Sequence, residues 1–159
     1  MNNNRRTVLA SALAASITAA VPLSAFAQKK IVVGFSQIGA ESEWRTANTN
    51  SMKSAAAAAG IELKFSDAQQ KQENQIKAIR GFIAQGVDAI LVAPVVATGW
   101  EDVLTEAKEA EIPVILLDRG VDAPQDLYLT SVASDQVKEG RVAGEWLVNT
   151  VGDKPCKVV

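Results

Sequence analysis

The chain has 159 residues, with 16 Lys and Arg against 18 Asp and Glu, a formal net charge of −2 and no histidine. The lack of histidine excludes Ser-His-Asp and Cys-His catalytic sites and removes the commonest zinc ligand, and we predict neither a metal site nor a cofactor. Nucleic acid is not expected as a partner, because phosphate binding requires a concentrated basic face and the sequence contains none.

Residues 1–27 have the order of a secretory signal peptide. Arg5 and Arg6 precede an apolar run over 8–21, and the small-x-small cleavage site Ala-Phe-Ala follows at 25–27. The run is too short to span about 30 Å of hydrocarbon, which favours a cleaved signal over a membrane anchor. Residues 4–9 also resemble a twin-arginine export motif, so the general secretory and twin-arginine routes both remain open. Either route predicts a periplasmic protein with no stable membrane insertion after cleavage.

Beyond the signal, strand and helix patterns alternate along the chain. Strands are predicted at 31–35, 61–65, 89–93, 114–117 and 127–130. Helices are predicted at 46–59, at 70–85, from about residue 98 and from about residue 134. Gly60 and Gly86 are expected to end the first two helices in the left-handed conformation.

The third and fourth helices carry more specific start signals. Thr98 and Glu101 match a T-x-x-E capping box, and Ser134 is the predicted N-cap of the last helix. The third helix should bury a face formed by Trp100, Val103, Leu104 and Ala107. The last helix should bury a stripe formed by Val142, Ala143, Trp146 and Leu147.

Apolar strands that alternate with helices predict an α/β fold, with a parallel sheet covered by helices on both faces. Right-handed crossovers place the carboxyl end of every strand at one edge of the sheet, where ligands bind in open α/β sheets. The loops after the first, third and fourth strands are therefore the candidate site.

These loops offer an aromatic ring, two guanidinium groups and two carboxylates: Trp44, Arg45, Arg119, Glu41 and Asp118. Hydroxyl and amide groups are added by Ser36, Gln37 and Ser42. The four formal charges cancel, which favours a neutral polyol over phosphate or a cation, because each sugar hydroxyl both donates and accepts a hydrogen bond. The flat face of Trp44 can pack on the C–H face of a sugar ring.

Each of these features also has a purely structural interpretation. Asp118 and Arg119 can form a solvated surface pair, and Trp44 can be the first buried residue of a helix. The acidic segment 41–43 can be an N-cap region that interacts favourably with the helix dipole. The convergence of all three features on one predicted edge favours the binding site.

Cys156 is the only cysteine, and the final residues 155–159 look like the beginning of an apolar strand. Exported proteins usually pair their cysteines. We therefore expect the chain to be a fragment, with a natural terminus and a free thiol as the alternative.

Five segments resemble the ribose-binding-like, type I periplasmic binding proteins of ABC sugar importers, and in particular their galactofuranose-binding members. They are 31–45 (IVVGFSQIGAESEWR), 69–78 (QQKQENQIKA), 85–90 (QGVDAI), 93–100 (APVVATGW) and 116–119 (LLDR). The resemblance covers residues 30–159.

The resemblance implies two α/β lobes that close on a sugar. It places Glu41, Ser42, Glu43, Trp44 and Arg45 on one wall of the cleft, with Asp118 and Arg119 opposite them on the same lobe. Glu43 stands where the family motif has glycine. The resemblance also implies an incomplete first lobe over 28–133, a hinge crossing near 131–134, and the start of a truncated second lobe over 134–159. Cys156 would pair with a downstream cysteine.

The function implied is capture of a neutral monosaccharide, with galactofuranose favoured, by a monomeric binding protein that delivers it to an ABC permease in the inner membrane. A binding protein that presents the sugar to a chemoreceptor or sensor kinase is one alternative. An exported sugar-active enzyme is another, but Glu41 and Asp118 each lie beside an arginine, which favours the ionised carboxylate and argues against a general acid. We expect no catalysis.

Overall fold

The computed structural model describes residues 29–152 and 154–157. The predicted signal peptide, 1–27, lies outside the described residues. Among the described residues, no helix combines the length and apolar character that a membrane crossing requires.

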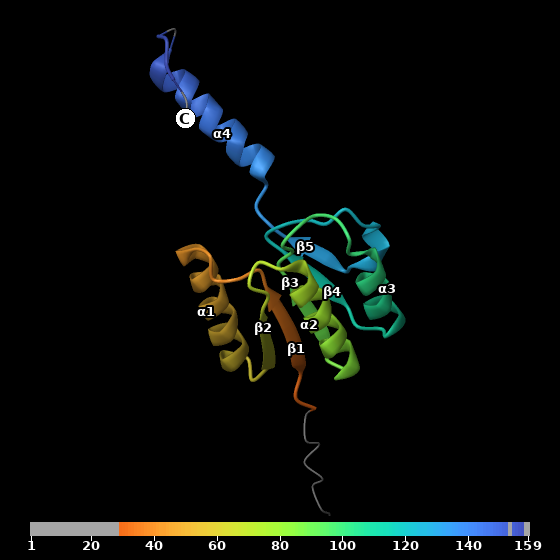
Figure 1. The fold of residues 1–159 in the computed structure, drawn as a ribbon. Coiled ribbons are helices and arrows are strands. Elements are labelled where there is room, and N and C mark those ends of the chain that lie inside the picture. Colours follow the sequence, from red (N-terminus) through yellow and green to blue (C-terminus); the bar gives the residue numbers. More distant parts are fainter. Residues whose placement is uncertain (1–28, 153, 158–159) are drawn as a thin grey trace, which may run out of the picture.

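Five parallel strands form one sheet in the order β2-β1-β3-β4-β5 (Figure 1). Their bounds are β1 Val32–Gln37, β2 Glu62–Asp67, β3 Ala89–Val92, β4 Val114–Leu117 and β5 Thr130–Val132. The helices are α1 Glu43–Ala58, α2 Gln72–Ala84, α3 Glu101–Glu109 and α4 Gln136–Val151, with a short 3-10 helix, η1, at Gln125–Leu127. The predicted α/β fold with a parallel sheet is confirmed.

The alternation of side chains along β1 shows which helix covers which face. Gln37 donates from Nε2 to Asn48 Oδ1 of α1 at 2.9 Å. Gly34 lies on the other face, where a Cβ would come within 2.5 Å of the Phe82 ring of α2. Helices therefore cover both faces, with α1 on one and α2 on the other.

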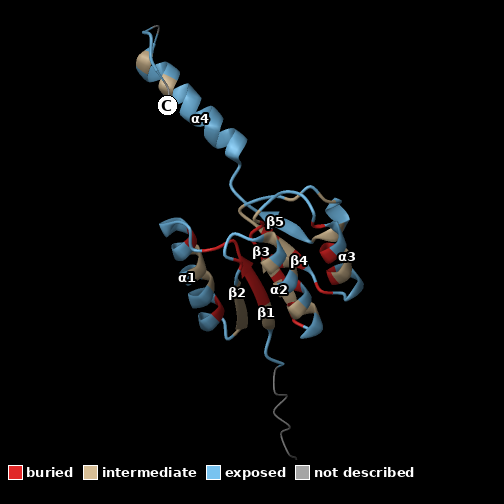
Figure 2. Cartoon of the chain, viewed as in Figure 1, coloured by how far each residue is buried: buried red, intermediate tan, exposed pale blue. Residues whose placement is uncertain are grey.

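The main core lies between the sheet and the side of α2 and α3. It joins strand residues Ile90, Val92, Val114 and Leu116 to helix residues Ile79, Phe82, Trp100, Val103, Leu104 and Ala107. The predicted buried face of α3 is confirmed, since its four residues are all at most 1% exposed. Figure 2 shows the buried residues gathered in the sheet and on the helix sides that face it.

Gly60 and Gly86 have φ of +68° and +62°, as predicted for the ends of the first two helices. The start of α3 differs from the prediction. Its N-cap is Trp100, and no side chain forms a capping hydrogen bond with the helix, so the predicted Thr98–Glu101 capping box is wrong. Gly99 turns the chain with φ +79°, and the buried Trp100 indole donates to the Val96 carbonyl at 2.8 Å, which fixes the helix start two residues later.

The C-terminal elements are also displaced from the predicted ones. The segment predicted as a strand at 127–130 contains the end of η1, and β5 begins only at Thr130. The N-cap of α4 is Asp135 in place of Ser134, and its carboxylate accepts a hydrogen bond from Lys138 N at 2.9 Å. A carboxylate one residue later competes successfully with the serine hydroxyl for the orphan N–H groups.

The predicted buried stripe of the last helix is wrong for the described residues. α4 extends away from the sheet (Figure 1), and Val142, Ala143 and Trp146 are exposed, while Leu147 is half-buried. Trp146 is 66% exposed. The stripe has the apolar period of a packed helix, but no described element lies against it.

Candidate functional site

The candidate site lies at the carboxyl edge of the sheet, where the loop after β1 meets the loops that follow β3 and β4. The strand order reverses at β1, because β2 lies on one side of it and β3 on the other. Such a switch point splays the two following loops apart and opens a crevice between them. The loop after β1 leads into α1, and the turn after β4 carries Asp118 and Arg119.

Ser42 begins α1 and thereby places the next three residues in its first turn. It has an extended backbone with φ −149°, and its Oγ accepts a hydrogen bond from Arg45 N at 3.2 Å. The helix therefore starts three residues before the predicted Thr46. The N-cap interpretation of this acidic segment is confirmed for Ser42, and Glu43 lies exposed in the first turn near the positive end of the helix dipole.

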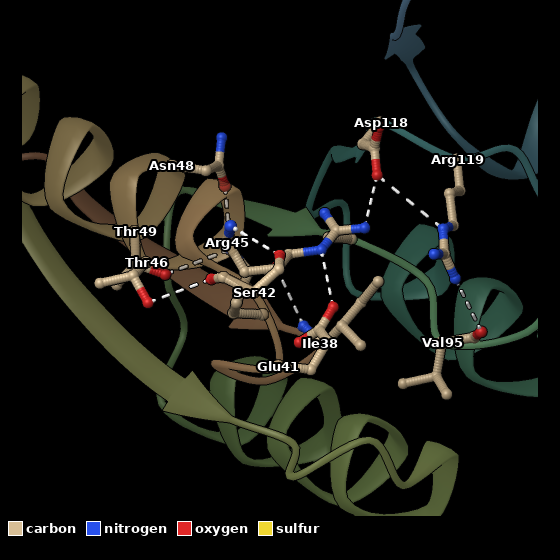
Figure 3. A network of polar contacts seen from close by, with 12 residues as sticks. Ile38, Glu41, Ser42, Arg45, Thr46, Asn48, Thr49, Val95, Asp118 and Arg119 are labelled. Atoms are coloured by element: carbon tan, nitrogen blue, oxygen red, sulfur yellow. Dashed lines mark hydrogen bonds and ion pairs between the residues drawn. The ribbon is translucent and has the colours of Figure 1, made fainter. Parts of the chain in front are cut away.

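Arg45 is the centre of the site. Its side chain is only 5% exposed, and it joins two carboxylates that lie 77 residues apart in sequence (Figure 3). Nε donates to Glu41 Oε1 at 3.0 Å, and Nη2 donates to Asp118 Oδ2 at 2.6 Å. Within the part of the chain that the structure describes, the buried Nη1 has no hydrogen-bond partner. The guanidinium thus keeps one buried donor group unpaired within the described residues.

Trp44 is exposed beside this network. Its side chain is 55% exposed, and Arg45 Cζ lies 4.7 Å from the centroid of its ring. The guanidinium covers one face of the indole, which orients the ring and leaves a large apolar surface available. The alternative of a buried Trp44 is therefore wrong: in the first turn of α1 the buried residue is Arg45.

Asp118 and Arg119 occupy a tight turn directly after β4. Asp118 has φ +66°, and Arg119 N donates to the Leu117 carbonyl at 2.7 Å, which closes a γ-turn of the strained type. Asp118 N donates to Val132 of β5 at 2.8 Å and helps to hold that turn. Strained residues of this kind gather at functional sites.

Arg119 is half exposed and lies between two acceptors. Its Nε is 3.8 Å from Asp118 Oδ2, and its Nη1 donates to the Val95 carbonyl at 3.4 Å. The turn after β4 thus brings a second guanidinium to the same network, as Figure 3 shows. Glu41, Arg45, Asp118 and Arg119 come together as predicted, with formal charges that cancel.

Ser42 and Glu43 point elsewhere. They line a hollow against the outer side of α1, together with Ala40, Glu41, Thr46, Ala47 and Asn50. That hollow does not include Arg45 or Asp118. The structure therefore gives Ser42 a capping role, and among the described residues Glu43 forms no hydrogen bond or ion pair with either arginine.

Two buried glutamines hold the loops of the site. Gln37 Oε1 accepts a hydrogen bond from Ile38 N at 3.0 Å, and Gln37 Nε2 donates to Asn48 and Thr49 of α1, so the side chain points toward the helix. Gln75 of α2 bonds to the loop after β3. The sequence analysis did not single out Gln75. A polar residue four positions before the core residue Ile79, on the apolar face of a helix, is the signal that identifies it.

Two other candidate features carry no site. Cys156 is exposed and is the only cysteine in the sequence. Among the described residues, no group of His, Cys, Asp and Glu side chains is arranged to hold a metal ion.

Comparison with known proteins identifies the family. Residues 33–159 match the periplasmic binding protein domain. The chain is 55% identical over 159 residues to the galactofuranose-binding protein YtfQ of Escherichia coli (strain K12). The alignment covers 98% of this chain and 48% of that protein. The chain therefore belongs to the periplasmic binding protein domain family, as its motifs predicted.

Two solved structures are similar in fold and sequence. One is a galactofuranose-binding protein, with a TM-score of 0.77 and 62% identity over 79% of this chain and 43% of the other. The second is the periplasmic binding protein component of the arabinose ABC transporter from Shewanella sp. ANA-3, bound to α- and β-L-arabinofuranose. It gives a TM-score of 0.73 and 59% identity over 75% of this chain and 40% of the other. The chain spans about half the length of these relatives, each of which is named as a binding protein.

Proposed function

We propose that this chain forms the first sugar-binding lobe of a periplasmic solute-binding protein that delivers a neutral monosaccharide to an ABC importer. The furanose form is favoured, with galactofuranose as the first candidate, because the similar proteins are named for galactofuranose or were solved with L-arabinofuranose. Residues 28–133 would form this lobe, and α4 would belong to a second lobe that closes on the ligand.

The observation that carries the proposal is the state of Arg45. A buried guanidinium between two carboxylates, with Nη1 unpaired within the described residues, is costly unless a ligand uses that donor. The exposed Trp44 beside it supplies the apolar surface on which a sugar ring packs. The carboxylates of Asp118 and Glu41 can accept hydrogen bonds from the sugar hydroxyls, and the arginines can donate to the hydroxyl oxygens.

Binding would proceed without a chemical step. Hydrogen bonds to charged groups contribute about 1.5–3 kcal/mol each, so three or four of them support roughly micromolar affinity once ordering costs are subtracted. Closure of two lobes would trap the sugar, and the closed form would be what the permease recognises. The binding protein would act as a monomer in the periplasm, after removal of residues 1–27 by one of the two export routes.

The test is a calorimetric titration of the protein, expressed at the full length of its gene, with D-galactose and L-arabinose. Both sugars contain furanose forms in solution. Trp44→Ala and Arg119→Ala should each weaken binding at least tenfold, since each removes a principal contact. Arg80→Ala, which removes an exposed arginine on α2, is the matched control and should bind as the wild type does.

Failure to bind either sugar would refute the proposed ligand class. Unchanged affinity in both Trp44→Ala and Arg119→Ala would refute the site. D-galacturonate extends the test, because a cleft whose charges cancel has no surplus cation for a carboxylate and should prefer the neutral sugar.

A further inference from the structure

Gln75 places a polar amide in the middle of the buried face of α2. The residue is fully buried, and its neighbours along that face, Ile79 and Phe82, belong to the hydrophobic core. Burying an amide is unfavourable unless its donor and acceptor both find partners. Gln75 finds both, and neither lies in its own helix.

The two partners flank Pro94 in the loop after β3. Gln75 Nε2 donates to the Ala93 carbonyl at 2.7 Å, and Val95 N donates to Gln75 Oε1 at 2.9 Å. Ala93 N still donates to the Ser36 carbonyl at 3.1 Å, but Pro94 has no N–H and cannot extend the strand ladder. The Gln75 amide therefore supplies the partners of the Ala93 carbonyl and of Val95 N. The amide of Gln75 holds both peptide groups in one orientation.

The hydrogen bond to Gln75 anchors Val95 through the peptide group that precedes it, and the Val95 carbonyl extends from the α-carbon held in this way. The carbonyl accepts the hydrogen bond from Arg119 Nη1, while Asp118 lies on the other side of the same guanidinium. Arg119 is 51% exposed, so these two acceptors, and not tight packing, limit where its side chain goes. A continuous set of contacts therefore runs from Gln75 through Val95 to Arg119.

We propose that Gln75 is a positioning residue of the sugar site, which holds the Ala93–Val95 backbone so that the Val95 carbonyl fixes the Arg119 guanidinium in the cleft. The inference rests on the proposed function, because it takes Arg119 as a sugar contact. Gln75 touches no ligand in this scheme and acts through Arg119 alone.

The test is a double-mutant cycle in the full-length protein, with D-galactose and L-arabinose as calorimetric probes. Gln75→Met keeps the shape of the side chain and removes both hydrogen bonds. It should weaken sugar binding about three- to tenfold, which corresponds to the loss of one hydrogen bond that orders Arg119. Gln85→Met is the matched control, since Gln85 is the C-cap of the same helix and its side chain donates to the Gly81 carbonyl within that helix.

The decisive readout is the same substitution in an Arg119→Ala background. If Gln75 acts through Arg119, Gln75→Met causes no further loss of affinity there, although it lowers the unfolding temperature equally in both backgrounds. An equal loss of affinity in both backgrounds would show a general structural effect and overturn the inference. So would an unchanged affinity for Gln75→Met alone.

If Gln75→Met does not fold, Gln75→Asn carries the same cycle, because it keeps a buried amide that is too short to reach both partners. Binding that is insensitive to Arg119→Ala would overturn the inference, and binding that is insensitive to Trp44→Ala as well would overturn the proposed site with it. Binding that depends on Arg119 but not on Gln75 would overturn the inference alone.

Discussion

Replacing Arg45 with methionine tests whether the site is held by one buried cation. Methionine fills a similar volume but removes the hydrogen bonds to Glu41 at 3.0 Å and to Asp118 at 2.6 Å. Bonds to charged groups contribute about 1.5–3 kcal/mol each, which sets an upper limit of roughly twice that. Both carboxylates are 27% exposed and regain hydration when the cation is removed. We therefore expect Arg45→Met to lower the free energy of unfolding by about 2–3 kcal/mol.

The assay is urea unfolding of the 159-residue chain followed by far-ultraviolet circular dichroism. A loss of this size lowers the urea midpoint by about 1–2 M for a domain of this length. Arg80→Met is the matched control, because Arg80 makes three hydrogen bonds to Glu106 but lies on the surface with a 54% exposed side chain. Its midpoint should move much less. Equal shifts for the two variants, or no shift for Arg45→Met, would refute the reasoning that burial gives the Arg45 network its strength.

Three further predictions follow from the described packing and charges. Gly34→Ala should lower the free energy of unfolding by about 1–3 kcal/mol, because its Cβ would lie 2.5 Å from the Phe82 ring, while Gly120→Ala, with open space at its Cβ, should be neutral by the same urea assay. Trp100→Ala should lower the free energy of unfolding by about 3–5 kcal/mol, because Trp100 is buried in the core. Trp146→Ala should change the free energy of unfolding of the 159-residue chain by less than about 0.5 kcal/mol, because Trp146 is exposed. A large effect of Trp146→Ala would show that α4 packs on the sheet. The hydrogen bond from Lys29 holds the pKa of Asp88 below its usual value. The stability that this interaction adds is therefore present above the unfolded-state pKa and is lost as pH falls through the folded-state pKa. In thermal melts between about pH 7 and 3, the melting temperature of D88N should fall less with acid than that of the wild type.

The first four strands and the parallel direction of the sheet followed from the sequence, because each apolar run is bounded by a glycine, a proline or a polar turn, whereas β5 begins only at the last residue of the segment predicted for it. Local sequence patterns predicted the first residues of the helices less accurately. Thr98 and Glu101 have the spacing of a capping box, yet Gly99 and the buried Trp100 decide where α3 begins. The start of α1 was placed too late, although the Ser42 N-cap lay within a segment already recognised as acidic and polar.

Within the site, sequence reasoning identified the loops better than the roles of single residues. Spacing alone left open whether Trp44 is buried or exposed, because the answer depends on Asp118, which lies 73 residues from Arg45. The partnership forms only when the sheet brings the ends of β1 and β4 to one edge. Gln75 was missed for the same reason, since its two partners belong to a loop about 20 residues further along the chain.

The stripe on α4 shows a different limit. Val142 and Trp146 have the spacing of a buried helix face, and the sequence predicted burial from that spacing alone. Periodicity identifies a face that can be buried, but only an opposing surface buries it. No described element lies against α4, so the face is exposed.

The central claim is that Arg45 and Trp44 form one wall of a sugar cleft, and the most direct measurement is a crystal structure of the full-length protein grown with D-galactose or L-arabinose. The account predicts a sugar ring packed on the exposed face of Trp44, with a hydroxyl oxygen within hydrogen-bond distance of Arg45 Nη1 and a second hydroxyl at Arg119. A sugar bound elsewhere on the chain, or one that leaves Arg45 Nη1 without a contact, would contradict it.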